Sequence, residues 1–234
     1  MLLEMESQEM KPFRTFAGPR KFVGLLALSL SLSVGAAIPA GAELPPAELV
    51  KALQSGGYIV YMRHTKTNKN QEDLDHNDLS NCATQRNLSD EGRAQARVIA
   101  EAFRELGIKV DSVFSSPYCR AKQTANIAFG DYQISNDLRY LSHIPDDERP
   151  AAIERIKRML GQAPSNGGIV ILVSHTENLK QTTGIWPKDS GVMHVFKPTP
   201  GGGYSHLGKI DPGEWTQLAH LGADEKRCVW FLCW

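Results

Sequence analysis

The fold is decided by residues 58–64, whose sequence is YIVYMRH. Five apolar residues in a row, two of them β-branched, are typical of a strand that is buried on both faces. Arg63 and His64 end this run, so the strand carries a polar pair at its carboxyl end. Open α/β sheets bind their ligands at that end of their strands. The stretch therefore predicts a central strand with a candidate site at its tip.

A second stretch repeats the pattern. Residues 169–175 read IVILVSH, an apolar run that ends in His175. Because the carboxyl ends of parallel strands meet at one edge of a sheet, we expect His64 and His175 at adjacent strand ends.

Strands and helices alternate along the rest of the chain. This alternation predicts an α/β fold, a three-layer sandwich with a mostly parallel central sheet and helices on both faces. The further strands are expected at 110–115, 134–138, 191–196 and 204–209, and the main helices at 89–106, 121–128, 150–160 and 177–183.

Four sequence blocks follow one another in a specific order. They are RHTKTNKN at 63–70, LSDEGRAQA at 88–96, VFSSPYCR at 113–120 and the strand that ends in His175. Each block alone is a common turn or strand end. Together they resemble the histidine phosphatase superfamily, which has the phosphoglycerate-mutase-like fold. The first block departs from that family's R-H-G-x-T-x-x-N pattern only at Thr65, which replaces glycine.

The resemblance implies a phosphatase that needs neither metal nor cofactor. In that reading His64 attacks phosphorus and becomes a phosphohistidine, which water then hydrolyses. Arg63, Arg120 and protonated His175 stabilise the charge on the phosphoryl oxygens, because guanidinium groups bind two oxygens at once. Asn70 lies where the family often contacts the phosphate.

The proton donor is the weak point of the resemblance. Family members carry it as Glu in an L-x-E block, where this chain has Tyr140, or as Asp directly after the second histidine, where it has Thr176. Glu177 is the nearest carboxylate in sequence and our candidate donor, although an acid in the first turn of a helix needs no catalytic role. The acids at 146–148 are a further candidate. A protein of the cell envelope that binds a phospho-ligand without catalysis therefore remains an alternative.

Composition limits the partners. The chain has 234 residues, 26 of them basic and 26 acidic, so its formal net charge is zero. Bulk electrostatics thus favour no nucleic acid partner. We expect a small-molecule or envelope phosphate compound as substrate.

Residues 1–42 have the layout of a secretory signal peptide. Basic residues precede an apolar run at 22–34, and AGA ends the segment at 40–42. The run is shorter than the roughly 20 residues that a spanning helix needs, which favours cleavage over a membrane anchor. We therefore expect an exported bacterial protein, periplasmic or secreted, without stable membrane insertion once the leader is removed. Its histidine phosphatase domain would span 43–215, followed by a tail of unknown role at 216–234.

Export would allow the four cysteines to form disulfides. Cys82, Cys119, Cys228 and Cys233 permit three connectivities. Cys82 and Cys119 each flank a loop next to the proposed site, and we expect these two to be bonded.

Overall fold

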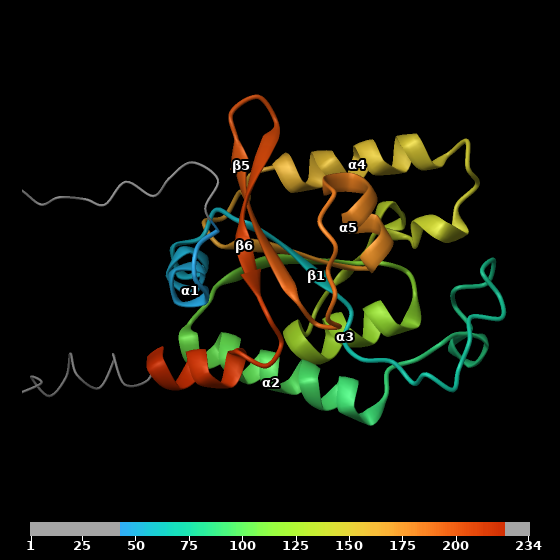
Figure 1. Cartoon of the computed structure of the whole chain (residues 1–234), viewed down its shortest axis with the longest axis horizontal. Coiled ribbons are helices and arrows are strands. Elements are labelled where there is room, and N and C mark those ends of the chain that lie inside the picture. Colours follow the sequence, from blue (N-terminus) through green and yellow to red (C-terminus); the bar gives the residue numbers. More distant parts are fainter. Residues whose placement is uncertain (1–42, 223–234) are drawn as a thin grey trace, which may run out of the picture. The chain divides into compact units, whose positions relative to one another are not determined.

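The computed structural model describes residues 43–222. Within this range the strands form a six-stranded sheet in the order β3-β2-β4-β1-β5-β6 (Figure 1). Neighbours among β3, β2, β4 and β1 are parallel, whereas β5 is antiparallel to both β1 and β6. The strands are β1 Ile59–Arg63, β2 Val110–Ser115, β3 Gln133–Ile134, β4 Ile169–Ser174, β5 Met193–Thr199 and β6 Gly203–Ile210.

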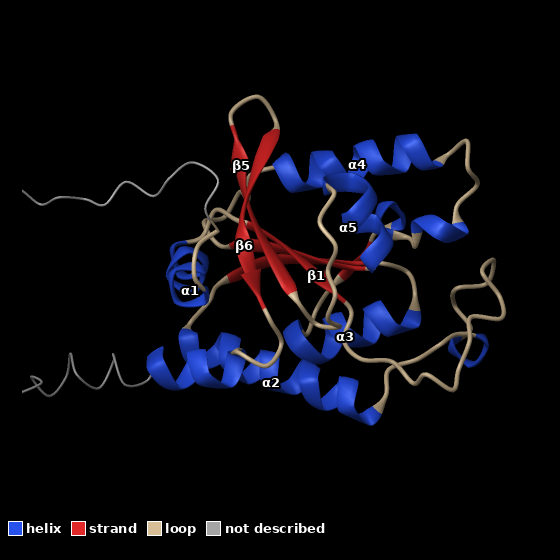
Figure 2. Ribbon diagram, viewed as in Figure 1, coloured by secondary structure: helices blue, strands red, loops and turns tan. Residues whose placement is uncertain are grey.

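Helices cover both faces of the sheet, as predicted (Figure 2). One face packs against α1 Pro46–Ser55, α2 Asp90–Leu106, α3 Cys119–Phe129 and a helix at residues 215–222. The other face packs against α4 Arg149–Gly161 and α5 Thr176–Thr183. Side chains alternate along each strand, so β1 sends Val60 and Met62 to the first core and Ile59 and Tyr61 to the second. The predicted three-layer α/β fold with a mostly parallel sheet is confirmed.

The pairing of β1 with β4 positions the site. The two strands are parallel, and Arg63 lies opposite Ser174 at their carboxyl ends. The residues that follow, His64 and His175, consequently leave the sheet side by side. The backbone N–H of His64 donates to the carbonyl of Ser174 at 3.0 Å, which holds the two chain segments together past the end of the sheet.

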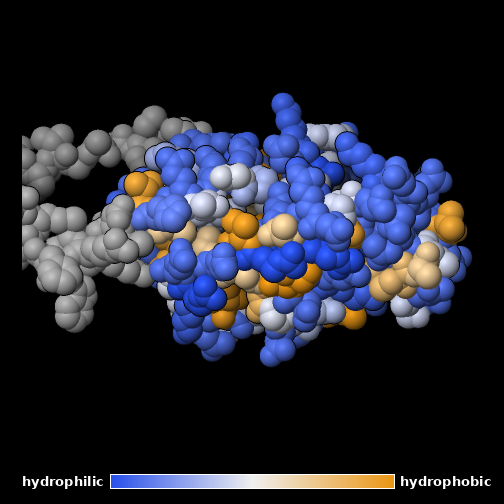
Figure 3. Space-filling view, turned by 90° about the horizontal axis from the view of Figure 1, so that it is seen from below, coloured by the Kyte–Doolittle hydropathy of each residue, from blue (hydrophilic) through white to orange (hydrophobic). Residues whose placement is uncertain are grey.

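The helix that follows His64 in the chain begins where the sequence predicts. Ser89 caps α2 by accepting a hydrogen bond from the N–H of Gly92, and Asp90 and Glu91 lie in the first turn. Figure 3 views the molecule from the side of α2, where hydrophilic residues dominate and apolar residues lie in scattered groups.

Two segments differ from their expected form. The strand expected at 134–138 is only two residues long, Gln133–Ile134, and a 3-10 turn at Asn136–Leu138 replaces its second half. The domain does not stop at residue 215. Trp215 is fully buried, and Leu218 and Ala219 belong to the first core, because the helix at 215–222 packs against α2. The expected leader at 1–42, together with Cys228 and Cys233, lies outside the described residues.

Candidate active site

Two buried histidines form the centre of the site. The rings of His64 and His175 meet edge to face, with centroids 5.5 Å apart, and the two residues are only 4% and 2% exposed. Tyr61 of β1 steadies the second one, since its hydroxyl lies 2.8 Å from the carbonyl oxygen of His175. The structure thus brings together the two strand-end histidines that the sequence singled out.

The orientation of His64 fixes its tautomer. Its Nδ1 lies 2.8 Å from the carbonyl oxygen of Thr65, and a carbonyl can only accept, so Nδ1 carries the proton. Nε2 then holds a free electron pair. Burial lowers the pKa of His64 well below its ordinary value, and the positive charge of Arg120 lowers it further. His64 is therefore a neutral imidazole, the form that can act as a nucleophile.

A hydrogen bond with Ser116 positions the ring of His175. Its Nε2 lies 2.7 Å from the hydroxyl oxygen of Ser116, the second serine of the VFSSPYCR block. Burial lowers its pKa well below the ordinary value, and Arg120 and His64 lower it further. His175 is neutral while the pocket holds no anion. A bound phosphoryl group would favour its protonation, because a nearby negative charge stabilises the imidazolium.

Arg120 supplies a buried positive charge from the first turn of α3. The residue is 1% exposed, and its Nη1 donates to Oδ1 of Asp73 at 2.8 Å. Its guanidinium also lies over the ring of Tyr118, 4.5 Å from the centroid. The Nε of Arg120 is buried and has no hydrogen-bond partner among the described residues. That donor remains free for an anion.

Arg63 is oriented by the segment after α5. Its Nη1 donates to the carbonyl of Lys188 at 2.6 Å and to that of Pro187 at 3.3 Å. Its Nε is buried and has no partner within residues 43–222. Burial lowers the pKa of Arg63, and Arg86 is the next largest cause.

Arg86 is a third positive group that the sequence reasoning missed. Its charge lowers the pKa values of Arg63, Arg120 and His64, and its side chain lines the polar cavity beside them. Its backbone N–H donates to the Asp73 carboxylate at 3.0 Å, and its Nε is another buried donor without a partner in the described part of the chain. Only its place two residues before the LSDEGRAQA block could have drawn attention to it, since the loop 66–87 has no periodic pattern.

A disulfide ties that loop to α3. Cys82 and Cys119 are bonded, with Cα atoms 5.7 Å apart, which confirms the expected pairing. The side chain of Gln85 adds a second tie by accepting from the N–H of Cys119 at 2.9 Å. Because Cys119 directly precedes Arg120, the loop that carries Asp73 and Arg86 is fixed beside the phosphate-binding candidate.

Two expected site residues lie elsewhere. Asn70 is exposed, and its N–H donates to the side chain of Asn68, so the structure does not bring it to the histidines. Glu177 follows His175 in the first turn of α5, where its carboxylate accepts from Gln181 at 2.6 Å. Within residues 43–222, Glu177 makes no hydrogen bond or ion pair with either histidine.

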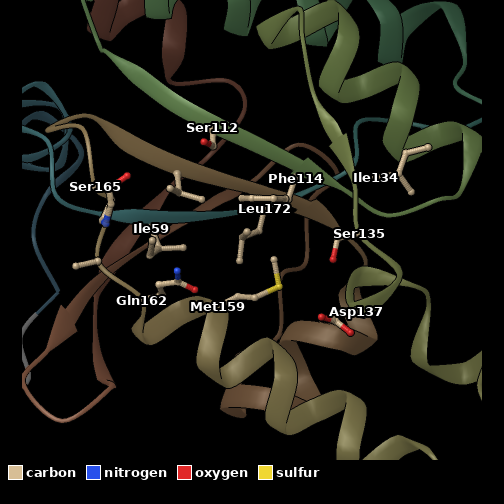
Figure 4. A pocket seen from close by; sticks show the side chains of 13 residues that line it. Ile59, Ser112, Phe114, Ile134, Ser135, Asp137, Met159, Gln162, Ser165 and Leu172 are labelled. Atoms are coloured by element: carbon tan, nitrogen blue, oxygen red, sulfur yellow. The ribbon is translucent and has the colours of Figure 1, made fainter.

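A polar cavity of about 350 Å³ opens beside the histidine pocket. It is lined by Lys69, Gln71, Glu72, Asp73, His76, Arg86, Tyr140 and His143. Since Asp73 binds Arg120, this cavity adjoins the phosphate-binding candidates. A larger cavity of about 460 Å³ lies away from the two histidines, between α4 and the sheet (Figure 4). Its walls include Ile59, Leu172 and Met159, and no residue of the histidine pocket takes part.

Residues 43–222 contain no cluster of three or more His, Cys, Asp or Glu side chains suited to hold a metal ion. Over the same residues, no helix has the length and apolar character required to cross a membrane.

Comparison with known proteins agrees with this geometry. The family model of the histidine phosphatase superfamily (branch 1) matches residues 59–142. Over these residues, which are just over a third of the chain, the sequence is similar to that superfamily. The match contains the RHTKTNKN, LSDEGRAQA and VFSSPYCR blocks and ends shortly after Tyr140.

Similarity to individual proteins and solved structures is partial. The mitochondrial serine/threonine-protein phosphatase Pgam5 of Drosophila virilis is 33% identical over 90 residues, which is 38% of this chain and 27% of that protein. The chain thus spans about a quarter of this relative. A candidate alpha-ribazole-5'-P phosphatase of Escherichia coli K-12 has a similar fold, with a TM-score of 0.50, 15% identity and coverage of 67% of this chain and 98% of that one. The protein histidine phosphatase SixA complexed with tungstate gives a TM-score of 0.46, 16% identity and coverage of 67% and 98%.

Proposed function

We propose that this protein is a metal-independent phosphatase that hydrolyses a phosphate monoester or related phospho compound through a phosphohistidine on His64. The observation that carries the proposal is the 2.8 Å contact between Nδ1 of His64 and the carbonyl oxygen of Thr65, which assigns the proton to Nδ1 and leaves the electron pair on Nε2 in a pocket shared with His175 and Arg120. The match to the superfamily model over residues 59–142 supports it.

The proposed reaction has two steps. Nε2 of His64 attacks phosphorus while the leaving group departs, and water then releases inorganic phosphate from the phosphohistidine. The free Nε groups of Arg63, Arg86 and Arg120 would bind the phosphoryl oxygens, together with His175 once it is protonated. Such fixed donors are the main source of electrostatic stabilisation in reactions of this kind.

Metal independence follows from charge. Three guanidinium groups beside one phosphoryl group perform the neutralisation that a divalent cation performs in other phosphatases. Activity should therefore survive an excess of EDTA, and vanadate should inhibit it.

The compartment and the substrate are part of the same proposal. A disulfide beside the site is favoured in an oxidising compartment, which supports export to the periplasm or the medium. The substrate would then be a small or envelope-derived phosphate compound, with no nucleic acid partner and no membrane insertion after leader removal. Fractionation of bacterial cells that express the full chain tests the location.

The experiment is turnover of a panel of phosphate compounds by the purified protein, with trapping of the phosphorylated enzyme. Wild-type protein should release phosphate and carry an acid-labile, base-stable phosphoryl group, and His64→Ala should abolish both signals. His220→Ala, which changes an exposed histidine in the helix at 215–222, is the matched control and should leave both unchanged. Tight phosphate binding without turnover would instead support the alternative, a non-catalytic phospho-ligand-binding protein.

A further inference from the structure

We propose that the phenol of Tyr140 is the proton donor to the leaving group. This inference rests on the proposed phosphatase function and names the residue that completes it.

Tyr140 stands at the border between the phosphate pocket and the polar cavity. Its ring centroid lies 5.0 Å from that of His175 and 5.9 Å from the guanidinium carbon of Arg120. The same side chain lines the 350 Å³ cavity, together with Arg86 and His143. With the phosphoryl group between His64 and Arg120, the leaving group would occupy the cavity. Tyr140 is thus placed where the bond to the leaving group breaks.

The carboxylates near Tyr140 are either bound to other protein groups or exposed at the outer part of the cavity. Asp73 accepts hydrogen bonds from the guanidinium of Arg120 and from the backbone N–H of Arg86, so its Oδ1 is already engaged as an acceptor. Glu177 accepts from Gln181 along the surface of α5, and Asp146 is paired with Arg149. Glu72 is exposed on the outer part of the cavity.

The other hydroxyl groups of the pocket are already in use. Ser116 is hydrogen bonded to His175, and the hydroxyl of Tyr118 lies 2.5 Å from Nδ1 of His143. Within residues 43–222 the Tyr140 hydroxyl has no hydrogen-bond partner. It is therefore the free O–H donor at this border.

Both steps balance with Tyr140 as the proton carrier. When Nε2 of His64 forms the N–P bond, the P–O bond breaks, its electron pair goes to the leaving oxygen, and that oxygen takes the phenolic proton. In the second step water forms a P–O bond, its proton returns to the phenolate, and the electron pair of the N–P bond returns to Nε2. Arg63 interacts electrostatically with Tyr140, and the guanidinium of Arg120 lies 5.9 Å from the Tyr140 ring. The two positive charges therefore stabilise the transient phenolate.

The test compares leaving groups of different basicity. An alkyl phosphate such as glycerol phosphate needs protonation of its leaving oxygen, whereas the phenolate of p-nitrophenyl phosphate leaves without it. In single turnovers, Tyr140→Phe should slow phosphoryl transfer from glycerol phosphate by about 10²–10⁴-fold, the usual contribution of a general acid. Release of nitrophenol in the first turnover should change by less than about fivefold. Tyr140→Glu, which returns an acidic group to the position, should restore much of the lost rate.

Control variants separate the possible donors. Tyr58→Phe, just before β1 at the opposite end from the site, should leave both substrates unaffected. The proposal is overturned if Tyr140→Phe slows both substrates equally, or if Glu177→Gln or Glu72→Gln produces the selective loss instead. Failure of the phosphatase proposal itself gives a different result, namely wild-type protein without turnover or His64→Ala with turnover intact.

Discussion

Asp73 holds the guanidinium that a substrate phosphate would need. Its side chain is only 11% exposed and that of Arg120 only 1%, so this ion pair is shielded from solvent. A carboxylate and a phosphoryl oxygen compete for the same N–H donor. In the ligand-free protein, Asp73 therefore takes part of the place of the phosphate.

Replacing Asp73 by Asn should have opposite effects on binding and stability. Removal of the competing charge should lower the inhibition constant of inorganic phosphate by about tenfold, which corresponds to about 1.4 kcal/mol. An unpaired buried guanidinium should also lower the free energy of unfolding by about 3 kcal/mol. Isothermal titration and urea denaturation measure the two effects. Weaker phosphate binding by Asp73→Asn would show that Asp73 only orients Arg120.

The element that carries Asp73 is the loop 66–87, which has little core of its own. Its position depends on the Cys82–Cys119 bond and on hydrogen bonds such as those of Gln85 to Cys119 and of Asn87 to Cys82. The cross-linked cysteines are 37 residues apart in sequence. Closing a loop of that length stabilises a folded chain by about 4 kcal/mol in the chain-entropy description.

Loss of this cross-link should affect both stability and catalysis. The double variant Cys82→Ser/Cys119→Ser should unfold about 2–4 kcal/mol more easily. It should also bind substrate more weakly, because Asp73 and Arg86 are no longer fixed beside Arg120. Thermal denaturation and the KM for p-nitrophenyl phosphate are the measurements. Dithiothreitol should reproduce both changes in wild-type protein and do nothing further to the variant; equal KM values would mean that the loop holds its place without the bond.

At the scale of the whole molecule, the buried histidines make the fold sensitive to acid. Burial lowers the pKa values of His64 and His175 well below the ordinary value and those of His143 and His194 to about 4. Unfolded histidines take up protons near pH 6.5, where the folded ones do not. Folding is thus fully favoured above about pH 6.5 and loses free energy as pH falls toward 4.

Urea denaturation between pH 7.5 and pH 5 should reveal this loss. Each buried histidine contributes at most about 1.4 kcal/mol per pH unit below its unfolded pKa. His194→Gln removes one such histidine, which lies away from the site. The dependence of the unfolding free energy on pH should then correspond to about one proton fewer taken up on unfolding. His220→Gln, at an exposed position, should leave the slope unchanged. A free energy of unfolding that is flat over this range would contradict the assignment of these histidines as neutral.

The sequence by itself determined the framework and the centre of the site. Apolar runs define β1 and β4, and their parallel pairing brings His64 and His175 together, because burial and strand register follow from a local, periodic pattern. The Cys82–Cys119 bond could be expected for a related reason, since both cysteines flank motif-bearing segments.

The partners of side chains in the irregular loop 66–87 could not be predicted from any periodic sequence pattern. The Asp73–Arg120 ion pair joins residues 47 positions apart, Arg86 reaches the pocket through a loop without periodicity, and Asn70 turns to solvent although its motif suggested a role. Only the tertiary structure decided these contacts and the place of Tyr140. The partner of a loop side chain is set by long-range packing and not by local propensity.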